Sequence, residues 1–334
     1  MGPLPKARGA DVTVQTSPQT PHTPVLLTEA LGYLAVREGG TYIDCTAGAG
    51  GHSAAIAKAM GEKGSLLCID QDNEALEFAR ARLAPYGSRV SFARGNFRDL
   101  HKIAADKGFE SVDSILMDLG VSSIQLDTPE RGFAFAHEGP LDMRMDQSSD
   151  GMTAADIVNT WDEQALANLF REHGEVRGSR RIARAVIAAR PLRSTWDLAK
   201  AVEQAAGGAR DRTQQHPATK VFLALRIRVN GELDSLSTAL PLARSLLGFG
   251  PSHQGGRMVT IAFHSLEDRI VKQFFGRESR DCLCPPVLPE CRCDHRATLS
   301  LLTRRAVRPS DNEVARNPRS RSGVLRAAQR KAVE

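Results

Sequence analysis

The sequence lacks the features that would place it in or across a membrane. No stretch of about 20 apolar residues, the length that a membrane-spanning helix needs, occurs in its 334 residues. The N-terminus also lacks the charged-then-apolar pattern of a secretory signal. We therefore expect a cytoplasmic protein with no membrane partner. The net charge of +5 and the pI near 9.0 permit a polyanionic partner without requiring one.

A complete dinucleotide fingerprint is also missing, because Ser53 stands where the pattern G-x-G-x-x-G requires glycine. The surrounding residues still predict a buried strand that ends at Asp44, a glycine-rich turn and a helix start. Gly48, Gly50 and Gly51 would let the backbone adopt positive φ angles and approach a ligand. A carboxylate ahead of the glycines suits an amino-bearing or cationic ligand, and S-adenosylmethionine has that character.

Polar or aromatic residues follow the next three predicted strands, which cover 65–69, 89–93 and 112–117. Asp70 follows the first and is expected to accept hydrogen bonds from the ribose diol. Phe97 lies just beyond the second and could face adenine, and Asp118 ends the third. Because doubly wound sheets bind ligands at the carboxyl ends of their strands, these residues together predict an S-adenosylmethionine site.

The pattern of strands and helices predicts a doubly wound, mostly parallel α/β sheet of the Rossmann-like methyltransferase type with an inserted helical subdomain. Strands and helices alternate over 41–118, only helical periods occur over 153–206, and a strand returns at 257–263. Helices are expected over 219–233 and 235–247. We expect a disordered lead-in at 1–20, a discontinuous methyltransferase domain at 21–130 and 219–334, and a substrate-recognition insertion at 131–218.

Positive charge gathers near the C-terminus, where residues 303–334 carry nine Arg or Lys and three acidic residues. We interpret this segment as a basic tail of the second part of the methyltransferase domain. Such a segment suits contacts with phosphates. A solvated arginine-rich surface is the alternative interpretation.

The six cysteines fall into two groups. Cys45 and Cys68 lie in or beside predicted strands, where they are expected to be core residues rather than the nucleophile that a carbon-5 cytosine methyltransferase would need. The other four form two C-x-C pairs in a Pro-rich segment and can either hold zinc or remain reduced thiols, whereas a disulfide is less expected in a cytosolic chain. These four are Cys282, Cys284, Cys291 and Cys293.

Five longer stretches stand out beside the glycine run. They are His22-Thr23-Pro24-Val25-Leu26-Leu27, Met117-Asp118-Leu119-Gly120-Val121-Ser122-Ser123-Ile124-Gln125-Leu126-Asp127, Gly139-Pro140-Leu141-Asp142-Met143-Arg144-Met145-Asp146, Phe263-His264-Ser265-Leu266-Glu267-Asp268-Arg269 and Asn317-Pro318-Arg319-Ser320-Arg321-Ser322. Together with the glycine run they resemble the bacterial small-subunit rRNA methyltransferase H family, RsmH, also called MraW. The resemblance spans nearly everything after His22.

The resemblance implies transfer of a methyl group from S-adenosylmethionine to N4 of a decoding-centre cytosine of 16S rRNA in the 30S subunit. No metal is required for this in-line transfer. The cofactor contacts that it implies are Gly50, Gly51, His52, Asp70, Phe97, Asp118 and Gln125. A methyltransferase for another substrate, and an assembly factor that uses the cofactor pocket structurally, remain alternatives. The sequence leaves a homodimer open.

Asp118 is the candidate catalytic residue. The lone pair of cytosine N4 is delocalised into the ring, and an acceptor for one amino hydrogen would stabilise the positive charge that develops on the nitrogen. The chain lacks the Asp/Asn-Pro-Pro-Tyr/Phe motif of DNA amino-methyltransferases, so Asp118 can alternatively bind only the cofactor. Arg131, Phe133, Phe135 and Arg144 are candidates to hold a splayed base, with core packing as the alternative for the phenylalanines. His264 has either a substrate role or a role beside a helix cap at Ser265.

Overall fold

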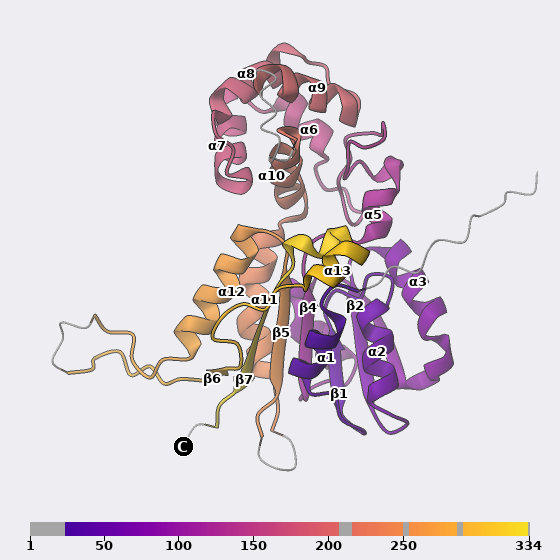
Figure 1. Cartoon of the computed structure of the whole chain (residues 1–334), viewed down its shortest axis with the longest axis vertical. Coiled ribbons are helices and arrows are strands. Elements are labelled where there is room, and N and C mark those ends of the chain that lie inside the picture. The colour runs from indigo at the N-terminus through magenta and orange to yellow at the C-terminus, as the bar shows by residue number, and fades with distance from the viewer. Residues whose placement is uncertain (1–23, 207–215, 250–253, 286–289, 333–334) are drawn as a thin grey trace, which may run out of the picture.

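A seven-stranded sheet forms the lower part of the molecule in Figure 1, in the strand order β3-β2-β1-β4-β5-β7-β6. This computed structural model describes residues 24–206, 216–249, 254–285 and 290–332. Neighbours among β1 to β5 pair in parallel, whereas β7 pairs antiparallel with both β5 and β6. The predicted mostly parallel, doubly wound sheet is confirmed. The strands are β1 (Thr41–Asp44), β2 (Ser65–Asp70), β3 (Val90–Arg94), β4 (Ser114–Asp118), β5 (Arg257–Ala262), β6 (Leu299–Leu301) and β7 (Val324–Arg330).

Apolar side chains alternate between the two faces of the sheet, as the two-residue period of a strand requires. In β1, Tyr42 belongs to the core on one face and Ile43 to the core on the other. Residues of α1 (Leu27–Leu34), α2 (Gly51–Ala59) and α3 (Asn73–Leu83) pack with Tyr42. Residues of α4 (Leu100–Asp106), α11 (Glu232–Leu246) and α12 (Ser265–Glu278) pack with Ile43. The sheet is therefore buried on both faces, which is typical of parallel sheets.

A group of helices lies above the sheet in Figure 1 and has its own hydrophobic core. Its members are α6 (Ala154–Thr160), α7 (Glu163–Gly174), α8 (Ser179–Ala188), α9 (Thr195–Ala206) and α10 (Ala218–Asn230). A capping box begins α6 at Thr153, since its hydroxyl accepts from the Asp156 N–H at 3.1 Å while the Asp156 carboxylate accepts from the Thr153 N–H at 2.8 Å.

The boundary between α10 and α11 differs from the one that we expected near residue 233. Gly231 separates the two helices with a φ of +58°, a left-handed conformation that suits glycine at a helix C-terminus. The buried side chains of α10, including Phe222 and Leu225, pack into the core of the upper helices. The helical unit therefore extends in its packing beyond the boundary that we placed at residue 218.

The C-terminal segment is not a tail, and that part of our prediction is wrong. β7 lies inside the sheet between β5 and β6, and Leu325, Ala327 and Ala328 are fully buried there. Before it come α13 (Asp311–Arg316) and the 3-10 turn η4 (Pro318–Ser322). The apolar residues within β7 outweigh the arginines around them, so the segment folds into the sheet.

Shorter elements complete the described chain. They are the helix α5 (Ser123–Asp127) and the 3-10 turns η1 (Ala84–Arg89), η2 (Phe97–Asp99) and η3 (Pro129–Arg131). Residues 132–153 contain no helix or strand of regular length. Among the described residues, no helix is long and apolar enough to cross a membrane. The lead-in predicted at 1–20 lies outside the described residues.

Candidate functional site

The order of strands in the sheet reverses between β1 and β4, and three carboxylates lie at the carboxyl ends of the neighbouring strands. Asp44 ends β1, Asp70 ends β2 and Asp118 ends β4. The loop after β1 is tied to β4 because the Asp118 N–H donates to the hydroxyl of Thr46 at 2.6 Å. Such a switch point is the usual ligand-binding position in doubly wound sheets.

The glycines after β1 have separate structural reasons. Gly48, with a φ of +50°, has open space on its side-chain face, since an added Cβ would meet its nearest neighbours only at 4.0 Å. A Cβ on Gly50 would lie 3.2 Å from Ala79, and one on Gly51 would lie 2.5 Å from Pro24. Gly48 therefore leaves room for a ligand, whereas glycine is needed at the other two positions for packing.

Asp70 holds the glycine turn from the end of β2. One carboxylate oxygen accepts from the Gly48 N–H at 2.8 Å, and the other accepts from the Asp72 N–H at 2.9 Å. Burial raises the pKa of Asp70 to about 6, against the lowering effect of these two hydrogen bonds. A carboxylate has about four acceptor positions, so Asp70 keeps capacity for ligand hydroxyls.

Three titratable side chains lie together beside the turn: Asp44 and His52 are buried, and Asp118 is partly buried. Burial raises the pKa of Asp44, which accepts a 2.6 Å hydrogen bond from the hydroxyl of Ser53. His52, at the start of α2, places its Nε2 3.1 Å from the carbonyl of Val25 and its Nδ1 3.4 Å from Asp118. Both ring nitrogens face acceptors, an arrangement that favours the doubly protonated imidazolium.

The pKa of His52 shows the balance between these effects. Burial lowers it, but the hydrogen bond and charge of Asp118, the charge of Asp44 and the carbonyl of Val25 together raise it above the ordinary value of 6.5. The resemblance implies that His52 contacts the cofactor. In the structure its ring lies between Asp118 and the Val25 carbonyl, in the segment before α1, and its contact with the cofactor remains a prediction.

Asp118 has one oxygen without a partner. Its Oδ2 faces His52, whereas its Oδ1 is enclosed and has no hydrogen-bonding partner among the described residues. A buried acceptor left unsatisfied costs about 1–3 kcal/mol, so the position suits a ligand with an N–H or O–H donor. This is the one carboxylate oxygen of the three strand-end residues with that property.

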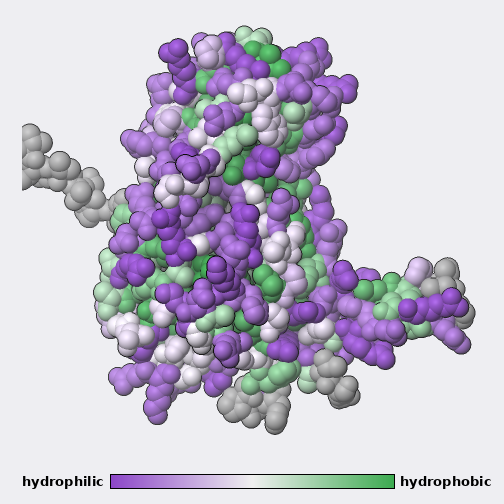
Figure 2. Space-filling view, turned by 180° about the vertical axis from the view of Figure 1, so that it is seen from behind, coloured by the Kyte–Doolittle hydropathy of each residue, from purple (hydrophilic) through white to green (hydrophobic). Residues whose placement is uncertain are grey.

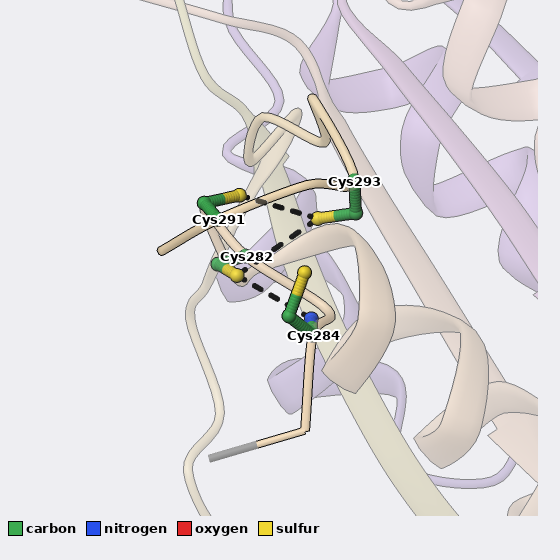
Figure 3. A group of neighbouring side chains, drawn as sticks. All are labelled: Cys282, Cys284, Cys291 and Cys293. Carbon is green, nitrogen blue, oxygen red and sulfur yellow. Dashed lines mark hydrogen bonds between the residues drawn. The ribbon is translucent and has the colours of Figure 1, made fainter. Parts of the chain in front are cut away.

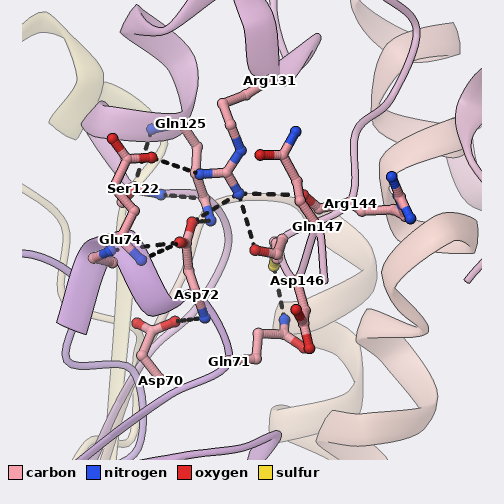
Figure 4. A network of polar contacts seen from close by, with 12 residues as sticks. Asp70, Gln71, Asp72, Glu74, Ser122, Gln125, Arg131, Arg144, Asp146 and Gln147 are labelled. Carbon is pink, nitrogen blue, oxygen red and sulfur yellow. Dashed lines mark hydrogen bonds and ion pairs between the residues drawn. The ribbon is translucent and has the colours of Figure 1, made fainter. Parts of the chain in front are cut away.

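A buried network around Asp72 and Arg131 adjoins the site (Figure 4). Asp72 caps α3 by accepting from the N–H groups of Glu74 and Ala75. Its other oxygen accepts from Gln125 at 2.7 Å and lies 2.8 Å from the guanidinium of Arg131, which is only 3% exposed. Sequence reasoning missed this network, although an aspartate directly before a helical stretch is a recognisable cap signal.

The network involves two residues to which the sequence assigns ligand roles, Arg131 and Gln125. The guanidinium of Arg131 also donates to the carbonyl of Met145 at 2.9 Å, so it is not free to hold a splayed base. Gln125 uses its amide oxygen in a capping box with Ser122 and its amide nitrogen on Asp72. A cofactor contact by Gln125 remains a prediction, and its two amide groups already have partners within the chain.

Two cavities lie next to this network. The larger, about 720 Å³, is bordered by Asp72, Arg131 and Met145, and the smaller, about 470 Å³, by Gln71 and Asn96 among others. The ion pair of Arg94 with Asp146, at 2.6 Å, borders both.

Phe97 begins η2 directly after Asn96, one of the residues that border the smaller cavity. The ring is partly buried against the core on the α4 side of the sheet. The predicted contact of Phe97 with adenine remains a prediction.

The remaining candidates have structural partners. Phe133 is buried in the core of the upper helices. The ring of Phe135 packs against that of Phe222, with 4.9 Å between the ring centroids. The guanidinium of Arg144 binds both carboxylate oxygens of Asp142, at 2.8 and 2.9 Å.

The predicted cap at Ser265 is wrong by one residue. His264 is the N-cap of α12 and forms a capping box with Glu267. Its imidazole therefore caps the start of the helix. The ring accepts from the Glu267 N–H, while the Glu267 carboxylate accepts from the backbone N–H of His264.

Comparison with known proteins gives one consistent result. The profile of the MraW methylase family matches residues 19–331. Ribosomal RNA small subunit methyltransferase H of Thermomicrobium roseum is 53% identical over 314 residues, which cover 93% of this chain and 94% of that protein. The protein of the same name from Dehalococcoides mccartyi is 49% identical over 310 residues, covering 93% and 86%. A solved rRNA methylase from Streptococcus thermophilus is similar only at a TM-score of 0.42 with 9% identity, over 91% of this chain and 95% of that one.

Proposed function

Because the chain belongs to the MraW methylase family, we propose that it methylates N4 of a decoding-centre cytosine in 16S rRNA. Its relatives carry the name of small-subunit rRNA methyltransferases. S-adenosylmethionine would be the methyl donor. The small ribosomal subunit in the cytoplasm would be the substrate. The observation that carries the proposed chemistry is the enclosed, unpartnered Oδ1 of Asp118.

The residues at the switch point fit this cofactor. The carboxylate of Asp70 would accept from the ribose hydroxyls, and the open face of Gly48 leaves room beside it. Asp118 offers an acceptor to the amino group of the target base. When bound, the cofactor supplies an electrophilic methyl group, and the protein's task is to hold the nucleophile in line with it.

Asp118 would act on the amino group of the target base. His52 lies against Oδ2 and, as an imidazolium, would hold the carboxylate in a fixed orientation. Oδ1 then accepts one hydrogen of the cytosine amino group, which favours localisation of the nitrogen lone pair. The same hydrogen bond strengthens as positive charge develops on the nitrogen during transfer.

The upper helical unit would bind the rRNA next to this position. Both cavities lie between residues at the edge of the sheet and the segment that leads to α6, as shown by the shared borders Arg94 and Asp146. A nucleotide that entered there would contact the sheet domain and the helical unit together. Such positions between structural units commonly hold substrates.

The decisive experiment measures methyl transfer to 30S particles that lack the modification. Wild-type protein with labelled S-adenosylmethionine should label N4 of a single decoding-centre cytosine, identified by mass spectrometry of rRNA fragments. Label on another base or on ribosomal protein, or no label at all, would overturn the proposal.

The role of Asp118 needs a separate measurement. Asp118→Ala should reduce turnover by about 100-fold or more, because it removes the acceptor of the amino hydrogen. Cofactor affinity, measured by calorimetry, should change only a few-fold. Asp106→Asn is the matched control, since Asp106 is an exposed acid at the end of α4. An equal loss of affinity and turnover in Asp118→Ala would make Asp118 a cofactor ligand and not a catalytic residue.

A further inference from the structure

The segment between α12 and β6 forms an arm that stands away from the sheet. Figure 1 shows it extending to the left of α12, and Figure 2 shows it from behind on the right. Most of its described residues are exposed, and Ala297, next to β6, is the first buried one after Glu278. The arm therefore has almost no apolar core to hold its conformation.

Four cysteine side chains nevertheless converge within the arm (Figure 3). Their sulfur atoms all lie within 4.8 Å of one another. The Sγ atoms of Cys291 and Cys293 are 3.6 Å apart, and those of Cys293 and Cys282 are 3.8 Å apart. The fourth member of the cluster is Cys284.

The two shorter separations, 3.6 and 3.8 Å, match the edges of a metal–thiolate tetrahedron. With the Zn–S distance of about 2.3 Å found in proteins, neighbouring sulfurs of a tetrahedral Zn(Cys)₄ site lie about 3.8 Å apart. A disulfide would need an S–S distance of about 2.05 Å. The four cysteines are free thiols in the structure, so the observed spacing corresponds to ligands around a common centre and not to covalent pairs.

Backbone N–H groups point at the same sulfurs. Leu283 donates to Cys293 and Arg292 donates to Cys284, each at 3.3 Å. Each of these hydrogen bonds joins one C-x-C pair to the other. Donors around a thiolate stabilise its charge and orient it toward a metal.

We propose that Cys282, Cys284, Cys291 and Cys293 bind one structural Zn²⁺ that closes the arm. Four thiolates in a tetrahedral arrangement select zinc among the common divalent ions. A site with four protein ligands has no open position, so the ion has no part in methyl transfer. Its binding energy would replace the hydrophobic core that the arm lacks.

The test begins with the metal content of the full chain, purified without a metal-affinity tag and under reducing conditions. We expect one zinc per chain by elemental mass spectrometry, retained through gel filtration. Replacement by Co²⁺ should produce the intense sulfur-to-cobalt charge-transfer absorption and the visible bands of a tetrahedral tetrathiolate site.

The double variant Cys291→Ser/Cys293→Ser should lose the zinc and become more sensitive to proteolysis within the arm. Arg292→Ala is the matched control, because it changes the residue between them but keeps the N–H that donates to Cys284. It should retain one zinc per chain. Both variants should keep the wild-type circular dichroism of the main body, since the arm lies outside its cores.

The proposal is wrong if the reduced wild-type chain contains no zinc and shows no charge-transfer absorption on titration with Co²⁺. It is equally wrong if the double variant keeps its zinc, which would place the ion elsewhere. Detection of Cys–Cys crosslinks in freshly purified protein would identify the cluster as a disulfide pair instead. None of these results depends on methyl transfer, so they are independent of the proposed activity.

Discussion

The replacement Asp70→Asn tests the cofactor site most directly, because it removes one charge and changes little volume. Both oxygens of Asp70 accept from backbone N–H groups, of Gly48 at 2.8 Å and of Asp72 at 2.9 Å. An asparagine would turn an amide N–H₂ toward one of these donors and would accept from the ribose without a charge. A hydrogen bond to a charged group contributes about 1.5–3 kcal/mol. We therefore expect affinity for S-adenosylmethionine to fall roughly 10- to 150-fold.

The same residue predicts a pH dependence. Because burial raises the pKa of Asp70 to about 6, the ionised acceptor is depleted as the pH falls through that value. Wild-type affinity should then weaken by up to about tenfold per pH unit below the pKa. The affinity of Asp70→Asn should not show this pH dependence. Subtracting the pH curve of the variant from that of the wild type removes the contribution of any titration of the ligand itself.

Calorimetric titrations with S-adenosylmethionine between about pH 5 and pH 8 make both measurements. Asp106→Asn is the control for loss of an exposed carboxylate, and it should bind as the wild type does. Thermal unfolding of each protein shows whether the site is still folded. An unchanged affinity of folded Asp70→Asn, or an identical pH dependence in the two proteins, would refute the role of Asp70 at the ribose.

Two further predictions concern the buried charges around the site. His52→Gln should destabilise the protein by about 2 kcal/mol at acidic pH, because the ion pair with Asp118 is lost. Since the pKa of His52 is raised above 6.5, this stabilisation is fully present below pH 6.5 and is lost as the pH rises through the folded-state pKa. Urea unfolding over that range should therefore show a shrinking difference from wild type, and a constant difference would contradict the protonated state. Arg131→Met leaves the carboxylate of Asp72, which is 3% exposed, without its guanidinium. It should cost about 3–5 kcal/mol of unfolding free energy, whereas the exposed Arg171→Met should cost almost nothing, and equal effects would show that the buried pair does not stabilise the fold.

The sequence alone predicts where the first four strands lie in the chain and the ends at which the site lies. Alternating apolar residues in a strand and acidic residues just beyond it are local signals, so Asp44, Asp70 and Asp118 can be assigned without a structure. The same local logic accounts for the capping box at Thr153. It fails for β7, where arginines flank a short apolar strand and the charge conceals the burial of Leu325.

Contacts between side chains that are distant in the sequence cannot be predicted from local patterns. Arg131 and Asp72 are separated by 59 positions of the sequence, and the spacing of these residues does not indicate that they form a buried pair at 2.8 Å. His52 likewise lies against Asp118 only because the fold brings the start of α2 close to the carboxyl end of β4. Sequence reasoning consequently assigned Arg131 to the substrate, where the structure gives it a role within the protein.

The sequence by itself therefore determined the sheet, the glycine turn and the strand-end carboxylates, because each depends on residues close together in the chain. Only the tertiary structure decided which of these carboxylates keeps a free oxygen, how His52 is charged and whether the four cysteines meet. Those properties depend on burial and on distances between segments far apart in the sequence, and a hydrogen bond or metal site exists only when folding brings its atoms within about 3–4 Å.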